Sequence, residues 1–142
     1  MKKFLVIIQC DIAQRRCSGW ACMKSFYDRT GSFEDLGTED VKYISFTCGG
    51  CCGKGVAAKI EHFANKLANQ SDASKDEVVV YLSSCMVTDH HHYSRCPHVA
   101  MIKGILAKHD FSNVIEGTYI SPNATQKRED GIYKEYHKVQ GR

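Results

Sequence analysis

The sequence has no long hydrophobic run, no block of charge of one sign and no convincing export signal. Spanning a membrane takes about 20 consecutive apolar residues, and the apolar runs of this chain are all much shorter. The net charge of +3 is small for 142 residues and is not gathered in one segment. We therefore expect neither a membrane nor a nucleic acid as a partner.

The first residues superficially resemble the start of an exported protein. Met1-Lys2-Lys3 precede the apolar run Phe4–Ile8, and Cys10 follows at the place of a lipoprotein cysteine. A signal peptide, however, has an apolar core of roughly 7–15 residues and small residues before its cleavage point, where this chain has Gln9. We expect this segment to form the first strand and the protein to be cytoplasmic.

Eight cysteines are the unusual feature of an otherwise ordinary composition. A hydrophobic fraction of 43% and a charged fraction of 25% are typical of a soluble globular protein, and 142 residues favour a single domain. Such a chain buries a sizeable core without disulfides, and thiols in the cytoplasm stay reduced. The cysteines therefore indicate metal binding or redox chemistry rather than a disulfide framework.

Short apolar runs alternate with amphipathic segments along the chain. Strands are expected at residues 3–9, 41–47, 77–84 and 113–119, and helices at 21–29, 56–67 and from Cys96 onward, with Pro97 at the first helical position. The run Val78–Leu82 is apolar throughout, as in strands that are buried on both faces.

This order of elements predicts an α/β fold. We expect a parallel sheet of about four strands with helices on both faces, in a flavodoxin-like or Rossmann-like three-layer sandwich with strand order 2-1-3-4. Residues 1–120 are expected to form this domain, and residues 121–142 a charged tail with at most one short helix.

Several cysteines follow the ends of predicted strands. Cys10 follows the first strand, Cys48 the second and Cys85 the third. Because the carboxyl ends of parallel strands lie at one edge of the sheet, we expect these thiols to meet where such folds bind ligands. The loops of the same edge carry Cys17, Cys51, Cys52 and Cys96.

The densest group of thiols lies in a glycine-rich turn at residues 47–55. Cys48 and Cys51 have the CxxC spacing of zinc and iron–sulfur sites. The glycines can adopt positive φ, which lets sulfurs of neighbouring residues point at one place. The turn also leads into a predicted helix, whose positive N-terminal end favours thiolates.

The segment Thr47–Lys54, with its run Cys48-Gly49-Gly50-Cys51, resembles the CGGC-domain family of small bacterial and archaeal proteins. Further positions that look like those of the family, over roughly residues 3–118, are Cys10, Cys17-Ser18-Gly19 with Cys22, Ser84-Cys85 and Cys96-Pro97-His98. The resemblance implies a metal-binding role with no established reaction. The chain departs from the family at Cys52, where a proline is usual, and in having no histidine at residues 117–120.

Together, the residues and the resemblance predict a cysteine-rich metal site. The predicted ligands are Cys10, Cys17, Cys48, Cys51, Cys85, Cys96 and His98. Four of them would satisfy tetrahedral zinc, whereas more than four clustered thiols suit an iron–sulfur cluster or two metal ions. The choice between zinc and an iron–sulfur cluster stays open, as do the roles of Cys22, Cys52 and His90–His92.

Two other functions fit parts of the sequence. Cys10 to Arg16 has the Cys-x5-Arg spacing of low-molecular-weight phosphatases and arsenate reductases, although the loop lacks the glycine that lets it curl around an oxyanion. A thiol–disulfide redox protein would use Cys48 with Cys51, or Cys51 with Cys52, and would act on a redox partner or a small molecule. Whether the protein is an enzyme is therefore open.

Overall fold

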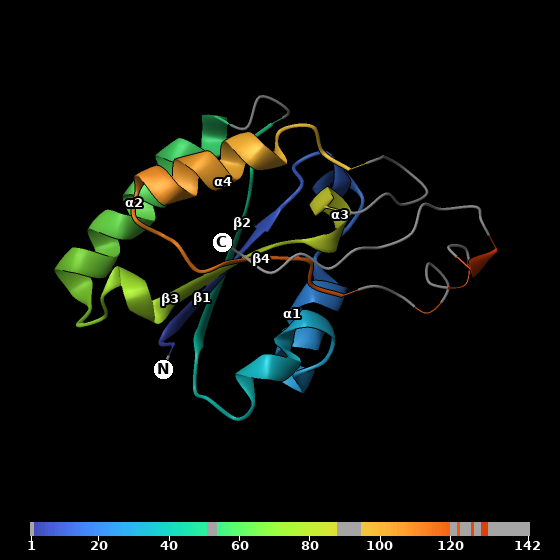
Figure 1. Ribbon diagram of the computed structural model, residues 1–142, viewed down its shortest axis with the longest axis horizontal. Coiled ribbons are helices and arrows are strands. Elements are labelled where there is room, and N and C mark those ends of the chain that lie inside the picture. The colour runs from blue at the N-terminus through green and yellow to red at the C-terminus, as the bar shows by residue number, and fades with distance from the viewer. Residues whose placement is uncertain are drawn as a thin grey trace.

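Four parallel strands form the centre of the fold (Figure 1). The computed structural model describes residues 2–50, 54–87 and 95–119, and also residues 122, 126, 129 and 130. The strands are β1 (Phe4–Gln9), β2 (Lys42–Thr47), β3 (Val78–Leu82) and β4 (Val114–Glu116). They pair in parallel in the order β2-β1-β3-β4, which confirms the predicted topology.

The two central strands are apolar on both sides because both of their faces are covered. All five residues of β3 are buried, and β1 is buried from Leu5 onward. Successive side chains of a strand point to opposite faces. Val6 and Ile8 accordingly belong to one hydrophobic core, and Leu5 and Ile7 to a second core on the other face.

Helices cover both faces of the sheet (Figure 1). The helices α2 (Lys54–Gln70) and α4 (Val99–Lys108) bury apolar residues in the core that contains Val6. The helix α1 (Trp20–Asp28) and the 3₁₀ segment Gly31–Leu36 bury Phe26 and Phe33 in the other core. The α/β class is confirmed, and the arrangement is consistent with flavodoxin-like layering.

The last helix begins later than the sequence pattern predicts. His98 is the N-cap of α4 with φ −100° and ψ 9°, so Pro97 lies before the helix and the predicted position of this proline is wrong. The Cys96 N–H donates to the Met86 carbonyl (2.9 Å), and the Val99 N–H donates weakly to the Cys96 carbonyl (3.4 Å). These bonds tie the chain to α3 (Ser84–Val87) and close a turn, so Cys96 lies ahead of the helix.

Two further points concern membrane crossing and the tail, as far as the described residues go. In that part of the chain, no helix combines the length and the apolar character that crossing a membrane requires. Almost all of the predicted tail at 121–142 lies outside the described residues, so its short helix stays a prediction.

Candidate metal centre

Three cysteines from distant parts of the chain line one small cavity at the carboxyl edge of the sheet. Cys10 directly follows β1, Cys48 directly follows β2, and Cys96 lies in the turn before α4. The cavity has a volume of about 30 Å³. Its other lining residues are Asp11, Ile12, Gly50, Met86, His98 and Ile102.

Backbone hydrogen bonds hold two of these cysteines in place. The Cys48 N–H donates to the Gln9 carbonyl (2.9 Å), which extends the pairing of β1 with β2 as far as the cysteine. The Cys96 N–H is bound to the Met86 carbonyl at the end of α3. The Cys48 side chain is only 6% exposed, and its thiol donates to the Gly50 carbonyl (3.5 Å). The thiols are therefore carried by a rigid edge of the fold.

Two glycines let the CGGC turn fold closely against the start of α2. Gly49 has φ +77°, and a Cβ there would lie 2.8 Å from the Gly55 Cα. A Cβ on Gly55 would lie 2.6 Å from the Cys48 carbonyl oxygen. Real Cβ atoms do not approach backbone this closely, so the turn can pack in this way only with glycine at both positions.

His98 lines the same cavity. It is the N-cap of α4, and its backbone N–H donates to the Cys96 sulfur (3.4 Å). The local turn therefore places a histidine two residues after a cavity cysteine, and histidine and cysteine are residue types that share zinc sites.

Two other cysteines contact hydroxyl groups and do not line the cavity. The Cys85 sulfur lies 2.9 Å from Ser83 Oγ, and the Cys22 sulfur lies 3.3 Å from Thr118 Oγ1. Burial raises the pKa of Cys85 to about 11, although hydrogen bonds from Ser83 and the Cys10 backbone N–H act in the opposite direction. Burial raises the pKa of Cys22 as well. Burial therefore favours the protonated form of both thiols.

The comparison with protein families agrees with this geometry. The family model for the CGGC domain matches residues 4–119. The chain belongs to the CGGC-domain family. The matched span contains all four strands of the sheet. It also contains every residue that lines the cavity of Cys10, Cys48 and Cys96, which we call the thiol cavity. Searches among curated proteins and among solved structures return no match to this chain.

The predicted ligand set of this CGGC domain is only partly gathered at the cavity. Of the predicted ligands, Cys10, Cys48, Cys96 and His98 line it. Cys17 is exposed away from it, and its sulfur accepts a hydrogen bond from the Gly19 N–H (3.4 Å). Cys51, Cys52 and His90–His92 lie outside the described residues.

The described side chains do not by themselves form a complete metal site. Within residues 2–50, 54–87 and 95–119, no three His, Cys, Asp or Glu side chains are placed so that they could hold one ion together. The donor types around the cavity nevertheless suit a metal that prefers sulfur and nitrogen. The full ligand set therefore stays a prediction.

Asp11 and Met86 line the cavity without being predicted as site residues. Asp11 directly follows Cys10, so its position just after a strand end could have identified it as a site residue. Met86 comes from α3, a helix of four residues that leaves no periodic pattern in the sequence.

The segment after Cys10 does not form the anion cradle of a Cys-x5-Arg enzyme. The Gln14 N–H donates to the Cys10 carbonyl (3.0 Å), and the Arg16 and Cys17 N–H groups donate to the Ala13 carbonyl (3.1 and 2.9 Å). An oxyanion site needs such N–H groups to point together at the anion. Here they are used within the segment, which argues against the phosphatase or arsenate-reductase alternative.

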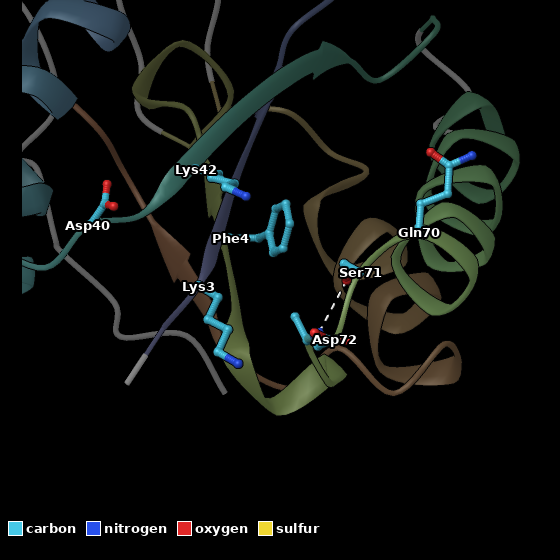
Figure 2. Close-up of a pocket in the computed structure, with 8 residues that line it drawn as sticks. Lys3, Phe4, Asp40, Lys42, Gln70, Ser71 and Asp72 are labelled. Atoms are coloured by element: carbon cyan, nitrogen blue, oxygen red, sulfur yellow. Dashed lines mark hydrogen bonds between the residues drawn. The ribbon is translucent and has the colours of Figure 1, made fainter.

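A larger hollow of about 390 Å³ lies at the opposite end of the strands (Figure 2). Its lining includes Lys3, Asp40 and Lys42, with the Lys42 Nζ 5.8 Å from the centre of the Phe4 ring. No described cysteine or histidine lines this hollow. The hollow is therefore separate from the cavity that the described cysteines line at the other edge.

Proposed function

We propose that this CGGC domain binds one thiophilic metal ion, Zn²⁺ before any other, in the cavity next to the ends of β1 and β2. The observation that carries the proposal is the meeting of three cysteines and one histidine from three segments around a single small cavity. Thiolate sulfur and imidazole nitrogen are the donors that zinc takes in proteins.

The proposed ligands are the thiolates of Cys10, Cys48 and Cys96. Cys51 is three residues after Cys48, and it or His98 completes a tetrahedral set. Because no three described donors are already placed to hold an ion, binding requires rotation of the described thiols about χ1. A bound zinc would supply a fixed positive charge that keeps these thiols deprotonated.

The donors around the cavity favour one ion over a cluster. Three cysteines and one histidine line it, and a mixed set of thiolates and imidazole satisfies a single tetrahedral zinc ion. The common iron–sulfur clusters are held by four cysteine thiolates. We therefore propose a mononuclear centre. Reducing, cytoplasmic surroundings would suit it, and none of the six described cysteines is joined to another by a disulfide.

Elemental analysis with an absorption spectrum tests the proposal on the full chain, purified without oxygen. We expect about one zinc ion per chain and no visible absorption band, because zinc(II) has a filled d shell. Protein that retains no metal and takes up no added Zn²⁺ would overturn the proposal. Iron and sulfide in similar amounts, with a visible band, would replace the single ion by a cluster.

A further inference from the structure

A chain of side-chain hydrogen bonds links the two strand ends that carry Cys10 and Cys48. The Thr47 hydroxyl donates to Asp11 Oδ1 (2.9 Å). The Lys59 ammonium group donates to the Thr47 carbonyl (2.9 Å) and to the Thr47 hydroxyl oxygen (3.1 Å). The Thr47 hydroxyl therefore accepts one hydrogen bond and donates another, a combination that no aliphatic side chain can replace.

These residues come from three elements that meet at the thiol cavity. Asp11 directly follows Cys10, Thr47 directly precedes Cys48, and Lys59 lies in α2. All three are half-buried, and the Lys59 ammonium also lies 5.9 Å from the centre of the Phe46 ring. The register of β1 with β2 ends at the pair Gln9 and Thr47. The Thr47–Asp11 bond continues the connection of the two strands beyond that point.

We propose that Thr47 is a positioning residue of the thiol cavity. Its hydroxyl fixes the turn that carries Cys10 against the turn that carries Cys48, and Lys59 binds Thr47 to α2. The proposal concerns the placement of two thiols, and its consequence for metal binding rests on the proposed function.

The expected consequence follows from the cost of ordering ligands. Without the hydroxyl, Asp11 loses its partner on β2, and the turn at Cys10 is less restrained. A metal ion must then order that turn itself, and this cost is subtracted from its binding free energy. Partners that orient metal ligands typically contribute about 10–100-fold in affinity.

The first test measures zinc affinity by competition with a chromophoric chelator. We expect Thr47→Val to weaken zinc binding by about 10–100-fold, and Thr47→Ser to restore it because serine keeps the hydroxyl. Thr38→Val is the matched control, since Thr38 is exposed in the loop before β2. Equal affinity of the wild type and Thr47→Val would overturn the proposal.

The second test uses metal-free, reduced protein and so does not depend on metal binding. Dibromobimane alkylates two nearby thiols, releasing two bromide ions, and peptide mapping identifies the bridged pair. We expect Thr47→Val to lower the yield of the Cys10–Cys48 bridge several-fold and Thr47→Ser to restore it. An unchanged yield in Thr47→Val would refute the positioning role even if zinc binds. If the wild type binds no zinc but the variants show the expected bridging pattern, the proposed zinc binding is refuted and the positioning role of Thr47 is not.

Discussion

Replacing Cys48 by serine is expected to remove most of the bound zinc and to lower thermal stability at the same time. Cys48 lies at the centre of the proposed site and is 6% exposed, and serine has nearly the same shape without a thiolate. A ligand at 100 times its dissociation constant stabilises the folded state by about 2.7 kcal/mol, so losing it should lower the unfolding temperature by several degrees. Metal content and thermal unfolding followed by circular dichroism measure the two effects.

Cys22→Ser is the matched control for this experiment. Cys22 is also partly buried, but its sulfur contacts the Thr118 hydroxyl and does not line the cavity. We expect this variant to keep its zinc. With a strong chelator present, the wild type and Cys48→Ser should unfold at similar temperatures. Undiminished zinc content in Cys48→Ser would contradict the ligand assignment.

Glu116 is the last residue of β4, and Glu116→Gln is expected to lower the free energy of unfolding of the whole domain. The Glu116 side chain is 3% exposed, and its two oxygens accept hydrogen bonds from Arg95 Nη1 (2.7 Å) and Lys103 Nζ (2.8 Å). Glutamine keeps the shape but loses the charge that both cations face. We expect a loss of about 1.5–3 kcal/mol in the free energy of unfolding, the range of hydrogen bonds to charged groups. Arg95 directly precedes Cys96, so the change should also loosen the third thiol-bearing segment.

The effect of Glu116 should depend on pH. Burial alone would raise the pKa of Glu116, but hydrogen bonds and charges of Arg95 and Lys103 together lower it below the ordinary value of 4.5. A lowered pKa in the folded state gives a stabilisation that is present above the unfolded value and lost as the pH falls through the folded value. The advantage of the wild type over Glu116→Gln should therefore be full at neutral pH and begin to shrink as the pH falls below 4.5.

Urea unfolding at several pH values, with a chelator to exclude metal release, measures this dependence. Glu61→Gln is the control because Glu61 is exposed on α2, and it should change stability by less than about 0.5 kcal/mol. Equal stability of Glu116→Gln and the wild type at neutral pH would show that the ion pairs of Glu116 with Arg95 and Lys103 contribute nothing to the free energy of unfolding.

The sheet and the place of the thiols could be predicted because each depends on a local pattern. The apolar runs of β1 and β3 require cover on both faces, which only a parallel sheet with two helical layers provides. Parallel strands then carry Cys10 and Cys48 to the same edge. These inferences need the direction of the strands and the order of the elements, but no side-chain geometry.

The parts of the site that depend on side-chain direction could not be predicted. The sequence predicts Cys85 directly after a strand, but β3 ends at Leu82, and the short helix α3 places the Cys85 thiol against Ser83 and outside the cavity lining. The spacing of the apolar residues in α2 places Lys59 on the polar face of this helix. Its long side chain nevertheless reaches Thr47. The entry into α4 is set by the bond from Cys96 to Met86, a contact between segments that no local pattern encodes.

X-ray absorption at the zinc edge tests the central claim most directly, because it counts the atoms bound to the metal. For the zinc-loaded chain we predict at least three sulfur neighbours at about 2.3 Å, with any remaining neighbour a nitrogen or sulfur. Among the predicted ligands only Cys48 and Cys51 share one turn, so a third sulfur from that set comes from another segment. A shell of only nitrogen and oxygen at about 2.0–2.1 Å would contradict the account.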